Sequence, residues 1–512
     1  MKVSLKIDQF THRNPGFTWS HKAGTLVLLF GVIFTIVARG DSFSLAGAVE
    51  AQNFARTSKL LSSQIDVNAP QVDGMTALHW AVHHDDWELG KTLLDLGANA
   101  SAKNRYGITP LYLACVNGNA NLVGALLEAG ADPNTTISGG ETALMTAART
   151  GDADVVTTLI NAGAGIDVEE RNGQTAAMWA AAEGHSDVIR ALLSAGADFQ
   201  SPLKRSGYTP FFFAVREGRT EVVSMLLDAG ASINAVMKPS KSGGNLPKKG
   251  TSPLLLAVEN GHYDLAVELL DAGADPNDDR SGFTLLHSLT WIRKPDIGES
   301  AAGDPKPQGS GRRNSDQFIR ELVARGADVD ARLKKGRRAG RGRVSVVGAT
   351  PVFLASDRAD LAYMKLLVEL GADPLIPNED GTTPLMVAAG IGSTAPEEEA
   401  GSEAECLAAV KYLVSLGADI NTVDANGETA MHGAAYKNIP SMAEYLDELG
   451  ADIRIWNTKN ALNRTPLLIA EGYRLGNFKP SFATVDAITA VMLANGVKPP
   501  TGPKPKHTNY AN

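Results

Sequence analysis

Residues 74–106 read GMTALHWAVHHDDWELGKTLLDLGANASAKNRY, and variants of this stretch recur along the chain. Gly74 is followed by starts of the same kind at Gly107, Gly140 and Gly173, each 33 residues after the last. A fixed period of this length is typical of repeat proteins, in which each copy stacks on its neighbours. Further copies start at Gly207, Gly250, Gly282, Gly348, Gly381, Gly427 and Arg464.

The residue types within one copy predict two short helices. Thr76 can cap the first helix, because its hydroxyl can accept a hydrogen bond from a free backbone N–H. In the next copy Pro110 stands at a helix start, where a proline costs no hydrogen bond. Gly118 then breaks the chain, and Gly130 suits the left-handed end of the second helix. That second helix carries one apolar stripe at helical spacing, made of Leu122, Val123, Leu126 and Leu127.

A 33-residue unit that opens on Thr-Pro-Leu-His-x-Ala is the signature of the ankyrin repeat. This chain resembles that family over residues 45–497, as in TALHWA at 76–81. The resemblance implies an all-α fold, a single ankyrin-repeat solenoid of about eleven repeats with long loop insertions. It also implies that His79, His287 and His432 bond to the backbone next door.

The copies at the two ends depart most from the pattern, and four insertions interrupt the others. We expect a degenerate N-terminal capping repeat at 45–72 and ankyrin repeats at 73–463. A C-terminal capping repeat at 464–497 and a disordered tail at 498–512 should follow. The insertions are 236–249, 293–313, 332–346 and 392–405. Their Gly, Pro and Ser content predicts irregular, mobile loops, and insertions in repeat proteins often line the binding side.

Residues 1–40 lie outside the predicted repeats. An uninterrupted apolar run at 23–38 follows four basic residues, Lys2, Lys6, Arg13 and Lys22. This order is typical of a signal peptide, and an uncleaved membrane anchor is the alternative, although spanning helices need roughly 17–25 residues. A buried N-terminal helix is the third interpretation. Because basic residues before an apolar run stay in the cytoplasm, the first two interpretations place the repeats outside it.

The resemblance extends to exported bacterial ankyrin-repeat proteins, so we expect a periplasmic protein or a membrane-anchored one that faces the periplasm. The expected function is a non-catalytic protein–protein interaction scaffold, a monomer that binds an unidentified folded partner in the concave groove and fingers. In this family the fingertips and the ends of the first helices contact partners. We predict partner contacts at His83, His84, Arg105, Tyr106, Arg149, Arg171, Arg205, Tyr208, Arg216, Lys248, Arg280 and Trp291. A plain solvated surface is the alternative for each.

The basic loop 332–343 offers a different function. Its cations are Lys334, Lys335, Arg337, Arg338, Arg341 and Arg343, a set that could bind acidic lipid or another polyanion. The net charge of −9 and the export signal argue against nucleic acid. A third hypothesis is a cytoplasmic interaction protein that its N-terminal apolar segment anchors to the membrane.

No catalytic constellation is present in the sequence. His79 and His83 would share a helix face, as zinc ligands do, but no Cys or carboxylate stands at ligand spacing. The HExxH, CxxC, phosphate-loop and GxSxG motifs are missing. Cys115 and Cys406 belong to distant repeats, too far apart for a disulfide within one chain. We therefore predict no enzyme activity, no metal and no cofactor.

Overall fold

The computed structural model describes residues 44–63, 65–240, 248–298, 307–335, 344–474 and 479–501, together with Lys504. The chain forms two compact units, 1–249 and 250–512, and each is described by itself. The N-terminal segment 1–40 and four cations of the basic loop, Arg337, Arg338, Arg341 and Arg343, lie outside the described residues. Over the described ranges, every helix is too short or too polar to cross a bilayer.

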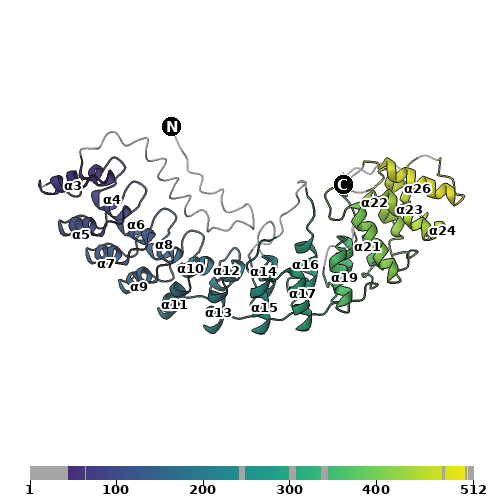
Figure 1. The fold of residues 1–512 in the computed structure, drawn as a ribbon, viewed down its shortest axis with the longest axis horizontal. Helices are drawn as coiled ribbons and strands as arrows, with labels where there is room; N and C mark the ends of the chain where they lie inside the picture. The colour runs from purple at the N-terminus through teal and green to yellow at the C-terminus, as the bar shows by residue number, and fades with distance from the viewer. Residues whose placement is uncertain are drawn as a thin grey trace. The chain divides into compact units, whose positions relative to one another are not determined.

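Helices in the N-terminal unit follow one another in pairs. They are α2 (Leu45–Glu50), α3 (Phe54–Leu61), α4 (Ala77–His83), α5 (Trp87–Asp95), α6 (Pro110–Asn117), α7 (Ala120–Glu128), α8 (Ala143–Thr150), α9 (Ala153–Asn161), α10 (Ala176–Glu183), α11 (Ser186–Ser194), α12 (Pro210–Arg216) and α13 (Thr220–Asp228). Each first helix packs against the first helix of the next pair, and in this unit the first helices form one row and the second helices another (Figure 1).

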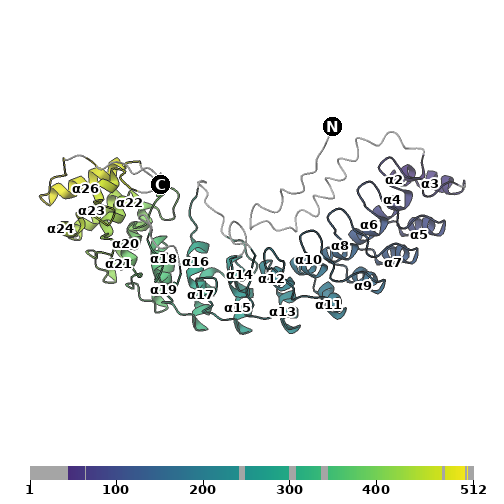
Figure 2. The same ribbon diagram turned by 180° about the vertical axis from the view of Figure 1, so that it is seen from behind.

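The C-terminal unit continues the same pattern. Its helices are α14 (Pro253–Glu259), α15 (Tyr263–Asp271), α16 (Leu285–Arg293), α17 (Ser315–Ala324), α18 (Pro351–Asp357), α19 (Leu361–Glu369), α20 (Pro384–Ala388), α21 (Glu403–Ser415), α22 (Ala430–Lys437), α23 (Pro440–Glu448), α24 (Ile453–Trp456), α25 (Pro466–Ala470) and α26 (Phe482–Ala494). Seen from behind, α14, α16 and α18 line one side of this unit and α15, α17 and α19 the other (Figure 2).

These helix pairs confirm the predicted all-α fold class. Apart from α24, each helix belongs to a pair, and among the described residues β-pairing is limited to one isolated bridge, Thr136 to Thr142. The predicted insertion at 392–405 is shorter than expected, because α21 already begins at Glu403. Ser402 caps that helix by accepting from the backbone N–H of Glu405, which the sequence reading placed in the loop.

The start and stop signals act as expected. Thr109 accepts a hydrogen bond of 3.1 Å from the backbone N–H of Tyr112, and Pro110 is the first residue of α6. On α7, Leu122, Val123 and Leu126 are fully buried. First helices come close together because small residues line their contacts; Ala114, Ala147 and Ala180 are examples with no exposed surface.

Buried histidines join two of the repeats to the repeat that follows. His79 Nδ1 lies 3.2 Å from the backbone N of Thr76 and 2.9 Å from its Oγ1, while Nε2 lies 3.1 Å from the carbonyl oxygen of Ile108. Since Nδ1 accepts from an N–H, the proton is on Nε2, which donates to the neighbouring repeat. His287 repeats this arrangement towards Ala349 at 3.1 Å, and burial lowers the pKa of His287 to about 4, so its ring is neutral. The role that the resemblance implied is therefore confirmed for His79 and His287. For His432 the expected bond to the next repeat is not made, because its buried Nε2 has no hydrogen-bond partner among the described residues.

We predict that His79→Ala destabilises the first repeats by about 1–3 kcal/mol, because the fully buried ring is lost and the part-buried carbonyl of Ile108 loses its partner. The matched control is His83→Ala on the same helix, whose exposed ring contacts Trp80 and His84 within its own repeat and should change stability by about 0.5 kcal/mol. Hydrogen exchange of the α4 and α6 amides measures both. Equal effects of the two substitutions would contradict the structural role of His79.

A buried carboxylate in the C-terminal unit couples stability to pH. Glu428 is buried, and its Oε1 accepts from Tyr436 Oη at 2.9 Å and from Asn460 Nδ2 at 2.7 Å. Burial disfavours the charged form and raises the pKa of Glu428 from 4.5 to about 7. Between these values the folded state holds more protons than the unfolded chain, so stability decreases as pH rises through this window.

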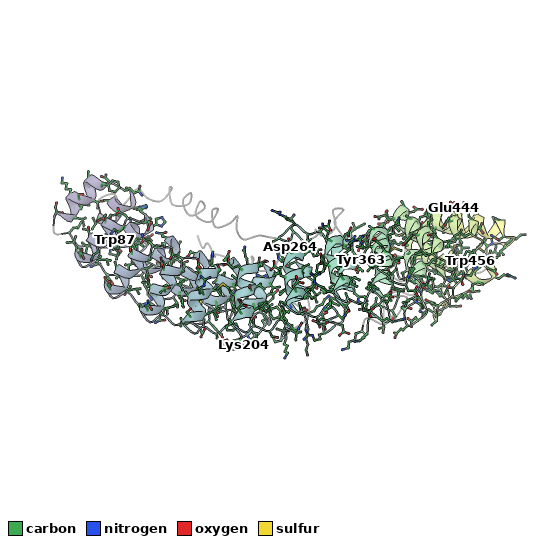
Figure 3. All side chains as sticks on the ribbon, turned by 60° about the horizontal axis from the view of Figure 1, so that its bottom comes forward. Trp87, Lys204, Asp264, Tyr363, Glu444 and Trp456 are labelled. Carbon is green, nitrogen blue, oxygen red and sulfur yellow. The ribbon has the colours of Figure 1, made fainter. Side chains whose placement is uncertain are left out.

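We predict that Glu428→Gln removes about 3 kcal/mol of this pH dependence between pH 4.5 and 7. The control is Glu444→Gln on the exposed surface of the same unit (Figure 3), which should leave the dependence as it is. Hydrogen exchange of the α22 amides, measured at pH 5 and pH 7.5 and corrected for intrinsic exchange, compares the three proteins. An unchanged pH dependence in Glu428→Gln would refute the assignment.

Candidate functional site

The ends of the first helices in the N-terminal unit present side chains at one common position. Seven residues after the capping threonine of α4, α6, α8, α10 and α12 stand His83, Val116, Arg149, Ala182 and Arg216. We call these five residues the helix-end row. His83 and Val116 are exposed, Val116 by 40%, and the other three are half-buried. Because the first helices stack directly on one another, the five positions follow each other along the unit.

Arg149 is held at the middle of the helix-end row. Its guanidinium lies 5.6 Å from the ring centroid of Trp179, a cation–π contact, and its Nη2 lies 3.2 Å from Oε1 of Glu141. The same oxygen accepts from Thr146 Oγ1 at 3.0 Å. The side chain is therefore pre-oriented while part of it stays accessible.

Arg216 is supported in a similar way. Its guanidinium lies 5.2 Å from the ring centroid of Tyr208 and 5.0 Å from that of Phe213, and its Nε donates to Glu217 at 2.7 Å. Tyr208 is only 8% exposed, because its ring packs against Phe213 at a centroid distance of 4.9 Å. We expected Tyr208 on the surface among the partner contacts; that placement is wrong, and its ring instead supports Arg216.

An aromatic cluster occupies the first position of the helix-end row. The ring of Trp80 lies 5.6 Å from that of His83 and stacks on His84 at 6.0 Å. His84 Nε2 is also 3.2 Å from the carbonyl oxygen of Glu50. Burial disfavours the charged ring and is the main cause that lowers the pKa of His83; the neighbouring His84 lowers it further. The rings of His83 and His84 thus belong to an aromatic cluster with Trp80. Among the described residues, no group of three metal-ligating side chains occurs.

The predicted fingertip residues of this unit lie at the surface. Arg105 stacks on Tyr106, with its guanidinium 4.8 Å from the ring centroid, and donates to Tyr106 Oη at 2.7 Å. Tyr106 is 54% exposed, so this pair offers an open aromatic face. Arg171, Arg205 and Lys248 are exposed as well.

Two predicted contacts belong to the C-terminal unit and have partners there. Arg280 binds the Asp278 carboxylate with two hydrogen bonds of 2.6 and 2.9 Å. Trp291 is half-buried and meets Phe283 edge-on at 4.9 Å. Of the basic loop, Lys334 is 77% exposed in its side chain and pairs with Asp279 at 2.6 Å, and Lys335 is exposed. The described start of this loop is thus tied to an acidic fingertip.

Sequence reasoning missed several residues of this surface. Val116, Trp179 and Phe213 were not singled out, although Val116 shares the position of Arg149 and the other two support arginines. A usable signal was present for Val116, because counting seven residues from each capping threonine finds it. The contacts of Trp179 and Phe213 depend on how neighbouring helices pack, which no count along the chain provides.

Comparison with known proteins places the chain in a family. A model described as ankyrin repeats (3 copies) matches residues 45–137 and 144–237. A second, ankyrin repeats (many copies), matches 121–160 and 399–446, and a third, ankyrin repeat, matches 249–280. The chain belongs to the ankyrin-repeat family.

Individual relatives share only parts of the chain. An ankyrin repeat and KH domain-containing protein of Caenorhabditis briggsae is 31% identical over 161 residues, which are 28% of this chain and 6% of that protein. The ankyrin repeat domain of human ASB11 matches with 25% identity and a TM-score of 0.39, over 45% of this chain and 98% of that domain. Ankyrin repeats indicate a protein–protein interaction scaffold. The ankyrin-repeat fold is typically non-catalytic.

Proposed function

We propose that this protein is a non-catalytic scaffold that binds a folded protein partner along the helix-end row and the fingertips of its N-terminal unit. The observation that carries the proposal is that the helix-end row holds two half-buried arginines, in the third and fifth of five successive repeats, and that each arginine lies over aromatic rings. Arg149 and Arg216 rest on aromatic rings, and Tyr106 and Arg105 form an open pair nearby in the sequence. Arginine, tyrosine and tryptophan are the residues that most often dominate binding energy at interfaces.

The geometry also lowers the cost of binding. A long side chain loses about 0.5–1.5 kcal/mol of conformational freedom when an interface immobilises it. Arg149 and Arg216 already have carboxylate and ring partners, so part of that ordering is complete in the free protein. An interface of standard size needs about 800 Å² from each partner, which a row along five stacked repeats can supply.

The first test is site-specific photocrosslinking in the cells that make the protein. A photoreactive residue at Arg216 should trap one protein, and the same probe at Asp95, on the exposed end of second helix α5, should not. Capture from Arg216 alone identifies the partner. Capture from neither position would refute the proposal, and the probe would then move to Arg338 to test binding to an anionic surface.

The captured partner then allows an affinity measurement. We expect Arg216→Ala to weaken binding by about 2 kcal/mol, roughly thirtyfold, as for a central interface arginine. The matched control is Arg190→Ala in second helix α11, an exposed arginine paired with Asp187, which should change affinity less than about twofold. Isothermal titration calorimetry measures both, and equal effects would place the interface elsewhere.

We further propose that the scaffold works outside the cytoplasm, exported or anchored to a membrane. The basic residues before the apolar run 23–38 support this proposal, because that order directs the following chain across a membrane. An alkaline phosphatase fused after residue 512 should be active, since this reporter needs an oxidising compartment. An inactive but intact fusion would favour the cytoplasmic, anchored alternative.

A further inference from the structure

The last two fingers of the N-terminal unit concentrate positive charge. These fingers are residues 203–208, just before α12, and residues 235–249, after α13. Their described cations are all exposed and are here called the fingertip cations: Lys204, Arg205, Lys238, Lys248 and Lys249. Neither finger contains an Asp or Glu, because the sequence has none at 199–216 or at 229–258.

Most of the fingertip cations are not used by the fold. Four of the five make no ion pair with a carboxylate of the described residues: Lys204, Arg205, Lys238 and Lys249. Arginines elsewhere in this unit differ, since Arg149, Arg190 and Arg216 each lie within 3.2 Å of a carboxylate oxygen. A ligand that binds the fingertip cations therefore has no internal ion pair to break at these four residues.

The first of the two fingers is a tight, hydrogen-bonded turn. The N–H of Leu203 donates to the carbonyl oxygen of Tyr208 at 2.8 Å, and the N–H of Gly207 donates to that of Leu203 at 2.7 Å. These bonds place Lys204 and Arg205 at the tip of the turn. The two charges therefore stand on an ordered backbone, and Lys204 lies at the edge of the unit (Figure 3).

The second finger packs against the first. Met237 has no exposed surface and holds the chain beside Lys238 in place. A Cβ at Gly207 would lie only 3.0 Å from the backbone nitrogen of Lys238, so the backbones of the two fingers are in contact. The charges of both fingers therefore belong to one patch.

The local charge of this patch outweighs the net charge of the protein, which is −9. At physiological salt, interactions between exposed charges are screened beyond about 8 Å. Successive helix pairs stack about 8–10 Å apart, so carboxylates in distant repeats contribute little to the field at the fingertips. The preceding finger carries Glu169 and Glu170, which bounds the patch on that side.

The residue types in the patch favour a lipid surface over a protein surface. Four of the five cations are lysines, and lysine is depleted at protein–protein interfaces, whose cores are apolar and aromatic. The described residues of these fingers expose no large apolar side chain, since Tyr208 and Met237 are buried and Leu203 is half-buried. A lysine is a compact, strongly hydrated charge, which suits attraction to a layer of anionic headgroups.

We propose that the fingertip cations dock the N-terminal unit on an anionic lipid bilayer. A basic residue near such a surface contributes about fivefold to the affinity, so five together give a firm but unspecific attachment. Lys204 and Arg205 precede the start of α12, whereas Arg216 ends that helix. The docking surface and the helix-end row thus lie at opposite ends of α12. This inference goes beyond the proposed function, and it concerns other residues than the basic loop 332–343.

The test measures binding of the full chain to vesicles of phosphatidylcholine, either alone or with about 30% phosphatidylserine to supply negative charge. Cosedimentation gives the two affinities, and their ratio is the readout. Any insertion of the apolar run 23–38 contributes to both kinds of vesicle and cancels in this ratio. The ratio should exceed about a hundred at low salt and decrease towards physiological salt, because the screening length falls from about 30 Å to about 8 Å.

A triple variant removes three charges from the patch: Lys204→Gln, Arg205→Gln and Lys238→Gln. All three side chains are exposed, so the fold should be unaffected. The ratio should fall about a hundredfold, at about fivefold for each cation. If the α12 amides of this variant lose hydrogen-exchange protection, the single variant Lys238→Gln decides, with an expected loss of about fivefold.

The matched control also removes two lysines and one arginine from exposed positions, which belong to α3, α5 and α11: Lys59→Gln, Lys91→Gln and Arg190→Gln. It changes the net charge of the protein by the same amount but leaves the fingers intact. Its ratio should change less than about threefold, because attraction to the bilayer depends on charges within a screening length of the surface.

A wild-type ratio near one, or equal losses in the two triple variants, would overturn the proposal. A labelled single-stranded RNA provides a further arm. If it binds more tightly than the anionic vesicles at the same salt, and loses affinity only in the finger variant, the patch is a nucleic-acid site instead. The vesicle assay needs no partner from cells, so its failure together with successful crosslinking at Arg216 would leave the proposed function standing.

Discussion

The whole molecule depends on the contact between one helix pair and the next. A single pair has too little apolar surface to bury by itself, so every repeat is stable only when its neighbours cover it. Small residues such as Ala114 and Ala180 allow the first helices to come close, and the histidines at 79 and 287 link each repeat to a carbonyl of the following one. This stacking forces equivalent residues of successive repeats into line.

Alignment by stacking explains how ordinary surface residues become a candidate site. A lone arginine at a helix end is a solvated charge of little consequence. Because the same position recurs along the stacked first helices of the N-terminal unit, accessible side chains such as those of Arg149 and Arg216 stand in one row, which is the arrangement that the proposed partner contact requires. Rings beneath them, from Trp179 and Phe213, restrict the guanidinium groups without burying them.

The two units use this surface differently. In the N-terminal unit, short turns between helices leave the helix ends accessible over the described residues. In the C-terminal unit, insertions return to the stack: residues 394–401 dock beside Lys437, and Ser310 donates its backbone N–H to His262 at 2.9 Å. Lengthening a loop adds little to the entropic cost of closing it, so the stack tolerates such insertions. Once present, an inserted segment can pack on the helices and become part of the surface.

The sequence by itself determined the fold class and the helix caps, because periodic spacing, capping threonines and helix-ending glycines act within a few residues of one another. It also singled out Arg149 and Arg216, whose positions repeat along the chain. From the sequence we expected Tyr208 on the surface, which is wrong, and we expected residues 392–405 to form a mobile loop. Only the tertiary structure could show that Tyr208 packs under Arg216 and that Ala400 bonds to Asp296, since the latter contact joins residues 104 positions apart. Such contacts are decided by how the repeats pack in three dimensions, and neither periodicity nor residue type records them.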